Sequence, residues 1–233
     1  LGKVGDVDRD GADDFVVGGA HSGLQVGAAY VLSGRTGQVL VMGVDERPGD
    51  NIGDTVDGCG DIDHDGVPDF MAGGGSGLRG VVRAFSGRDG RGIHTWSTET
   101  LPCAYSYTLK GGATDLDQDG TPDVLVGAGG CILLLSGRDA SVMLDITNLS
   151  ERIGTTIAVL GTQPGSRFPV FAVHYQSFGH DPINNPLGAL GKLSVFRGSP
   201  AGVETFGLSC RGRLASTPTV GARDLGTRGV RVS

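Results

Sequence analysis

Three short segments of this chain carry aspartates at alternating positions, a spacing that suits the binding of a hard cation. Each reads Asp-x-Asp-x-Asp-Gly-x-x-Asp, and the three copies start at Asp6, Asp61 and Asp115, 55 and then 54 residues apart. Positions 1, 3 and 5 of a tight loop can aim three carboxylates at one point, and glycine at position 6 permits the sharp reversal. The backbone carbonyl of position 7 can then turn inward, and the aspartate at position 9 adds another carboxylate.

This donor set, made of oxygen alone, predicts three Ca²⁺ sites. About six oxygens together with water fall within the range for Ca²⁺, whereas Mg²⁺ tends to keep its waters and needs a strict octahedron. Four carboxylates crowded in an empty loop repel one another, so we expect ion binding to be coupled to local folding. The predicted ligands are Asp6, Asp8, Asp10, Ala12 and Asp14 in the first loop, Asp61, Asp63, Asp65, Val67 and Asp69 in the second, and Asp115, Asp117, Asp119, Thr121 and Asp123 in the third.

Two other interpretations fit these segments less well. An EF-hand requires Glu at position 12 and flanking helices, but position 12 is Val17, Ala72 or Val126 and strand patterns follow. A solvated acidic turn would explain one copy, and three copies in register argue against it. His64 occupies position 4 of the second loop, where we expect no ligand and a side chain that faces solvent.

The residues after each loop predict short strands. An apolar run ending in glycine comes first, as in 15–18, then a second run ending in Ser-Gly-Arg, as at Ser33, Ser86 and Ser136, then a third run. We interpret these serines as turn residues and not as nucleophiles. Four short strands repeated every ~50 residues indicate the blades of a β-propeller.

The predicted fold class is therefore all-β, a β-propeller or propeller fragment of about four four-stranded blades. The fourth unit keeps its strand patterns, but segment 162–170, where its loop should lie, contains no carboxylate. The expected blades cover residues 1–206, at about 1–45, 46–100, 101–149 and 150–206, with a C-terminal β tail or the start of a further module at 207–233.

These residues resemble the FG-GAP repeats of integrin α-subunit propellers and their bacterial relatives over about residues 1–206. The aspartate motif, the hydrophobic run ending in glycine and the later Ser-Gly turn carry the resemblance. It implies a calcium loop that joins the first two strands of a blade, and ligands that meet the opposite face. Segments 51–53 and 152–154 (Asn-Ile-Gly and Arg-Ile-Gly) are the nearest counterparts of the Phe-Gly that names the family, and no domain typical of an integrin accompanies them.

Composition limits the partners. The net charge is −7, and basic residues are scattered with no stripe that would suit a phosphate backbone, so nucleic acid is not an expected partner. Three bound Ca²⁺ would bring the formal charge close to neutrality. No run approaches the ~18 apolar residues of a membrane span, so we expect no membrane insertion in this segment. The four cysteines form no CxxC pair, and a disulfide between Cys103 and Cys131 or two buried thiols both stay open.

The predicted function is that of a non-enzymatic, secreted or cell-surface module for adhesion or recognition. Segment 175–190, rich in Asn, Pro and Gly, is the candidate contact loop for an extracellular protein or glycan ligand, with Tyr175, Phe178 and His180 as candidate contacts. A flexible spacer without a binding role is the alternative for this segment. No convergent acid, base and nucleophile occur outside the aspartate loops. The alternatives are a scaffold or accessory domain of a secreted polysaccharide lyase or hydrolase, and a structural spacer in a large surface protein.

Overall fold

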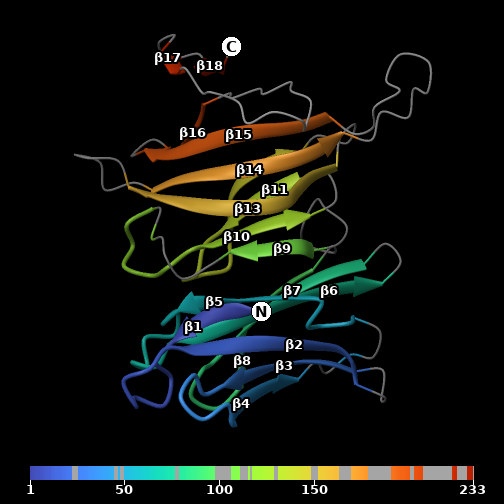
Figure 1. Cartoon of the computed structure of the whole chain (residues 1–233), viewed down its shortest axis with the longest axis vertical. Helices are drawn as coiled ribbons and strands as arrows, with labels where there is room; N and C mark the ends of the chain where they lie inside the picture. Colours follow the sequence, from blue (N-terminus) through green and yellow to red (C-terminus); the bar gives the residue numbers. More distant parts are fainter. Residues whose placement is uncertain are drawn as a thin grey trace.

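The computed structural model is built from antiparallel β-strands, which confirms the predicted all-β class (Figure 1). It describes residues 1–22, 26–44, 47, 50–76, 79–97, 106–110, 115, 117–128, 131–147, 152–162, 169–177, 190–199, 202–206, 222–224 and 230–232. No helix occurs among these residues. The described part of the chain thus offers no helical segment with the length and apolarity needed to cross a bilayer.

Four sheets of four strands follow one another along the chain, and each is ordered as the strands occur in sequence. The first contains β1 (Gly2–Gly5), β2 (Asp14–Ser22), β3 (Val26–Leu32) and β4 (Val39–Val44). The second contains β5 (Thr55–Gly60), β6 (Asp69–Ser76), β7 (Arg79–Phe85) and β8 (Gly92–Ser97). The third contains β9 (Ser106–Lys110), β10 (Val124–Ala128), β11 (Cys131–Leu135) and β12 (Val142–Thr147). The fourth contains β13 (Arg152–Thr162), β14 (Pro169–Ser177), β15 (Leu190–Ser199) and β16 (Gly202–Phe206), and a separate pair is formed by β17 (Ala222–Asp224) and β18 (Val230–Val232).

Each four-stranded sheet lies inside one of the sequence units expected above. The division of 1–206 into four blade domains, and the role of 207–233, remain predictions because a sheet by itself does not define a domain boundary.

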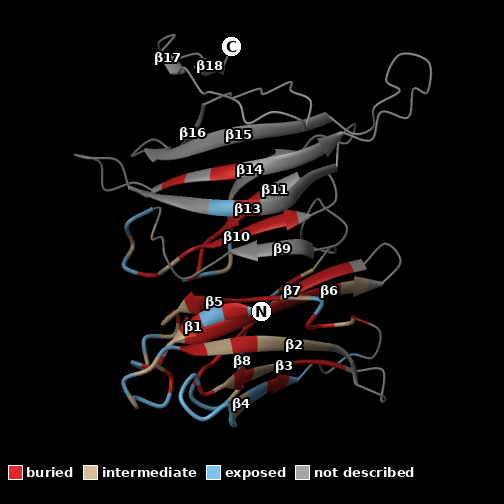
Figure 2. Ribbon diagram, viewed as in Figure 1, coloured by how far each residue is buried: buried red, intermediate tan, exposed pale blue. Residues whose placement is uncertain are grey.

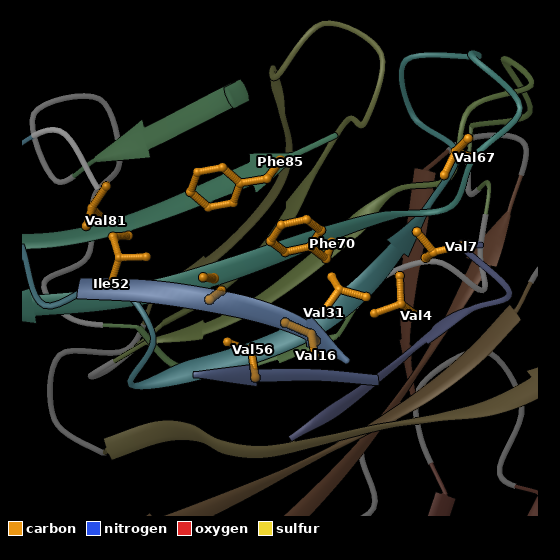
Figure 3. Packing of buried hydrophobic residues seen from close by; sticks show 12 residues of the cluster. Val4, Val7, Val16, Val31, Ile52, Val56, Val67, Phe70, Val81 and Phe85 are labelled. Carbon is orange, nitrogen blue, oxygen red and sulfur yellow. The ribbon is translucent and has the colours of Figure 1, made fainter. Parts of the chain in front are cut away.

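Consecutive residues of the second sheet face different neighbours, so this sheet is buried on both sides. Phe70 packs against Val16 and Val31 of the first sheet, whereas Met71 belongs to the core shared with Val124 of the third. The alternation follows from the pleat, which points successive side chains to opposite faces. Figure 3 shows the core between the first and second sheets, which contains Phe70. Figure 2 shows buried residues concentrated where the sheets meet.

A β-bulge precedes each of the first two aspartate loops. The register of β1 on β2 shifts between Lys3 and Gly5, and that of β5 on β6 shifts between Gly58 and Gly60. The last glycine of each strand has a left-handed backbone, with φ of 116° at Gly5 and 74° at Gly60. An extra residue bends a strand and increases its twist, and here it directs the chain out of the sheet and into the loop.

Candidate metal centres

The three aspartate motifs form the connections between the first and second strands of the first three sheets, namely β1–β2, β5–β6 and β9–β10. Their backbones share two left-handed positions. Glycine occupies position 6, as in Gly66 with φ of 82°, and position 4 is left-handed without glycine, as in His64 with φ of 59°. The position-2 side chains anchor the first two loops in the cores between sheets, since Val7 and Ile62 are both buried.

Backbone amides hold the carboxylates in place. In the second loop, Asp65 N donates to Asp61 Oδ1 at 3.0 Å and to Asp63 Oδ1 at 3.2 Å. Gly66 N donates to Asp61 Oδ2 at 2.9 Å, and Val67 N donates to Asp65 Oδ1 at 2.9 Å. The first and third loops repeat this set with distances between 2.8 and 3.1 Å.

The carboxylates converge in all three loops. Each loop brings together one oxygen from each of three aspartates, all within 4.8 Å of one another. Oxygens that share one Ca²⁺ lie about 2.4 Å from it and hence at most about 4.8 Å apart, so the donor sets fit this ion. The converging residues are Asp6, Asp8 and Asp10, then Asp61, Asp63 and Asp69, then Asp115, Asp117 and Asp123.

The other predicted ligands do not belong to these converging groups. Asp14, Asp65 and Asp119 lie in their loops but outside these converging triplets. For the backbone carbonyls of Ala12, Val67 and Thr121, the inward direction remains a prediction. The proposed ligand sets as a whole therefore also remain predictions, although three aspartates from each one do meet.

The aspartates at position 9 are buried, and each joins two segments of the same sheet by hydrogen bonds: its own loop and the turn between the third and fourth strands. Asp69 is fully buried; its Oδ2 accepts from Ile62 N at 2.8 Å in the loop, and its Oδ1 accepts from Gly87 N at 2.9 Å in the β7–β8 turn. Asp14 repeats both contacts with Val7 N at 2.7 Å and Gly34 N at 2.9 Å. These residues connect the loop to the turn at the far edge of the sheet.

Burial has an electrostatic consequence at Asp69. Desolvation raises the pKa of its carboxyl to about 6, although hydrogen bonds from the amides of Gly87 and Ile62 act in the opposite direction. A nearby cation favours the ionised form of a carboxyl. The second loop therefore contains a carboxylate whose ionisation would be stabilised by a bound cation.

An arginine contacts the position-5 aspartate in each of these three repeats, which the sequence analysis did not foresee. Arg35 Nε donates to Asp10 Oδ2 at 2.8 Å, and Arg88 Nε donates to Asp65 Oδ2 at 2.5 Å. In the third repeat, the guanidinium of Arg138 lies 3.9 Å from Asp119 Oδ2. The hydrogen bond from Arg88 lowers the pKa of Asp65. The recurring Ser-Gly-Arg triplet is the signal in the sequence, since it places an arginine at the same position of each turn.

The serine of that triplet acts as a turn residue, as predicted. Ser33 Oγ accepts from the backbone amide of Arg35 at 3.3 Å, Ser86 Oγ accepts from Arg88 at 3.3 Å, and the corresponding bond to Ser136 is 3.2 Å. All three serines are buried. Their hydroxyl groups are thereby engaged in holding the turn that presents the arginine.

The candidate contact loop falls largely outside the described residues. Phe178 and His180 are not described, and Tyr175 lies within β14, where only its backbone is described. Tyr175 pairs with Lys192 and Ser177 pairs with Leu190, so the ends of segment 175–190 belong to the sheet. Of the cysteines, Cys59 is free and buried, and the possible Cys103–Cys131 pair lies outside the described side chains.

Comparison with known proteins gives several integrin α subunits. Integrin alpha-5 of Xenopus laevis is 31% identical over 170 residues, which are 62% of this chain and 16% of that protein. Integrin alpha-V of Gallus gallus is 37% identical over 91 residues, covering 34% and 9% of the two chains. Integrin alpha-8 of Mus musculus is 30% identical over 151 residues, covering 54% and 14%.

The chain thus matches between 9% and 16% of the length of these relatives. No protein-family model matches the sequence. A solved structure described as "Crystal structure of BBS1N in complex with ARL6DN, soaked with lead" covers 84% of this chain and 64% of its own, with a TM-score of 0.44 and 12% identity.

Proposed function

We propose that this chain, an integrin-like relative of the FG-GAP propeller proteins, is a non-enzymatic extracellular module for adhesion or recognition that depends on structural calcium. The observation that carries the proposal is that three aspartates converge in each of three equivalent loops, at motif positions 1, 3 and 5 in the first loop and at positions 1, 3 and 9 in the other two. The similarity to integrin α subunits over about half the chain supports it.

Calcium in these loops would act on the fold of each blade. Each loop joins the first two strands, and its position-9 aspartate bonds to the turn between the third and fourth, as Asp69 does to Gly87. An ion that fixes the loop would thereby restrain both connections. Extracellular-type sites have Kd near 10⁻⁴–10⁻³ M, roughly the range of calcium outside cells. At about tenfold above Kd each site contributes about 1.4 kcal/mol, and three contribute about 4 kcal/mol.

Calcium stoichiometry tests the first half of the proposal. Equilibrium dialysis with radioactive calcium should give three ions per chain at millimolar calcium. Asp63→Ala should remove one of the three, because Asp63 belongs to the converging triplet of the second loop. Asp139→Asn is the matched control: it also removes one negative charge, but Asp139 lies in a β11–β12 turn, where it accepts from Ser141 N. No bound ion at millimolar calcium would contradict the proposal.

A partner screen tests the second half. The wild-type domain should retain an extracellular protein or glycan from an immobilised panel, and replacement of residues 179–188 with a short Gly-Ser linker should abolish that binding without unfolding the domain. These limits spare the paired residues of β14 and β15. Unchanged binding after the replacement would remove His180 from the contact surface. Release of sugar products from a polysaccharide panel would contradict the non-enzymatic assignment.

A further inference from the structure

Successive aspartate loops touch one another through the residue at position 4. Arg9 of the first loop donates from Nη2 to the carbonyl of Gly66 in the second loop at 2.9 Å. His64 of the second loop places Nε2 3.1 Å from Thr121 Oγ1 in the third. Each pair is separated by 57 residues in sequence, and each bridging residue has a left-handed backbone, with φ of 61° at Arg9 and 59° at His64.

The contacted segments are those that hold the position-5 aspartates of the next loop. Arg9 bonds the carbonyl of the peptide group whose amide, Val67 N, donates to Asp65 Oδ1 at 2.9 Å. One peptide group therefore separates the guanidinium from a predicted ligand of the second site. His64 reaches Thr121, which is buried and whose amide donates to Asp119 Oδ1 at 2.8 Å. The first bridge thus ends one hydrogen bond away from a predicted calcium ligand, and the second ends on Thr121, whose carbonyl is itself a predicted ligand.

The bridging residues are fixed by their own loops. Arg9 lies between Asp8 and Asp10, and Asp10 N donates to the carboxylates of Asp6 and Asp8 at 2.9 and 3.1 Å. Whatever orders these carboxylates also restrains the backbone that aims Arg9 at the second loop.

We propose that the three predicted calcium sites are coupled in series, with Arg9 linking the first to the second and His64 linking the second to the third. An ordered first loop strengthens calcium binding at the second, and an ordered second loop strengthens it at the third. This inference rests on the proposed calcium function. The expected coupling is about three- to tenfold in affinity per bridge, the size that one hydrogen bond supplies.

The third loop provides an internal control. Gln118 occupies position 4 with φ of 65°, matching Arg9 and His64. The corresponding segment of the following unit, 162–170, contains no carboxylate, so the series ends at the third site. Gln118→Ala therefore removes the side chain at the same loop position as Arg9→Ala does. In the third loop, however, no further predicted calcium site follows that could lose affinity.

Site-resolved NMR titration tests the coupling. The amides of Gly11, Gly66 and Gly120 each donate to the first aspartate of their own loop at 2.9 Å, so each reports one site as calcium is added to the whole chain. Asp8→Ala disables the first loop and should raise the Kd read at Gly66 about three- to tenfold. In the Arg9→Ala background, the same change should move that Kd less than twofold. Gln118→Ala should leave all three Kd values unchanged.

The possible outcomes distinguish a failure of the serial coupling from a failure of the proposed calcium function. The serial coupling would be overturned if Asp8→Ala left the Kd read at Gly66 unchanged, or raised it equally with and without Arg9. The proposed calcium sites would not be contradicted by either result. No shift at any of the three glycines would overturn the calcium function and the coupling together. If Asp8→Ala unfolds the first sheet, Asp63→Ala with and without His64→Ala, read at Gly120, makes the same test one step further along.

Discussion

At the scale of single residues, the position-9 aspartates combine burial with a fixed hydrogen-bond role. Asp14, Asp69 and Asp123 are all buried, and each accepts from the glycine of the turn that closes its sheet. A buried carboxylate is costly unless hydrogen bonds or a cation compensate it. Protonation offers a third way to lower that cost, so the loops should respond to pH as well as to calcium.

The pH dependence follows from Asp69. The pKa of its carboxyl is about 6 in the folded domain against an ordinary value of 3.8, so without calcium the folded state binds more protons than the unfolded state between these values. Stability without calcium should therefore fall as pH rises from about 4 to about 6. Bound calcium favours the ionised carboxylate, so its stabilising effect should be largest above pH 6 and shrink towards pH 4.

Melting temperatures measured with calcium and with EDTA between pH 4 and 7.5 check this expectation. In EDTA, Asp69→Asn should flatten the pH dependence, because the amide does not titrate. An equally steep decline between pH 4 and 6 in Asp69→Asn would contradict the assignment to this residue.

At the scale of elements, the Ser-Gly-Arg turn and the aspartate loop form one unit through a close backbone approach. A Cβ added at Gly87 would lie 1.9 Å from the carbonyl oxygen of Pro68 in the loop, and one at Gly137 would lie 1.9 Å from that of Pro122. Only glycine allows this approach. The repeated glycine of the turn is thus a packing requirement of the loop beside it.

Gly87→Ala should therefore destabilise the domain, by more than about 2 kcal/mol, since loop and turn must separate to admit a methyl group. Gly92→Ala is the matched control: a Cβ at this exposed position of β8 meets nothing within 4 Å, and the expected change is within about 0.5 kcal/mol. Urea unfolding of both variants, with and without calcium, measures the difference. Equal stability of the two variants would contradict the close-approach argument.

The local pattern of the elements could be predicted from the sequence, and contacts between elements could not. Apolar runs bounded by Gly and Asp predicted strands such as β2 and β6, because strand periodicity and turn chemistry are local properties. The prediction for His64 was incomplete: it is exposed, but its ring also contacts Thr121, 57 residues away. The pairing of Arg88 with Asp65 was likewise hidden, because it depends on the fold of the blade around the loop.

At the scale of the whole molecule, stacked sheets supply the stability that short strands lack. Phe70 and Phe85 stack with ring centroids 5.4 Å apart in the core between the first two sheets (Figure 3). Trp96 lies in the next core, and its Nε1 donates to the carbonyl of Ala140 in the third sheet's turn at 2.9 Å. The second sheet is held by both neighbours, so unfolding of the first three sheets should be cooperative.

Phe70→Ala should cost about 3–5 kcal/mol, the usual range for removing a buried aromatic ring. Val39→Ala is the control, because Val39 on β4 is 58% exposed and should change stability by no more than about 0.5 kcal/mol. Emission from the single tryptophan, Trp96, follows the unfolding. A loss below about 1 kcal/mol for Phe70→Ala would contradict the packing of the first two sheets.

The aspartate loops also determine how the whole molecule should respond to calcium. They contain 13 of the 26 acidic residues of a chain whose net charge is −7. Neutralising them should therefore stabilise the fold and reduce its self-repulsion together.

Thermal unfolding in millimolar calcium and in excess EDTA tests this account most directly. Calcium should raise the melting temperature by on the order of 10 °C, as about 4 kcal/mol does for a domain of this size. Asp8→Ala, Asp63→Ala and Asp117→Ala, one residue from each converging triplet, should each remove about a third of that rise. Identical melting temperatures in calcium and in EDTA would contradict the claim that these three loops hold structural calcium.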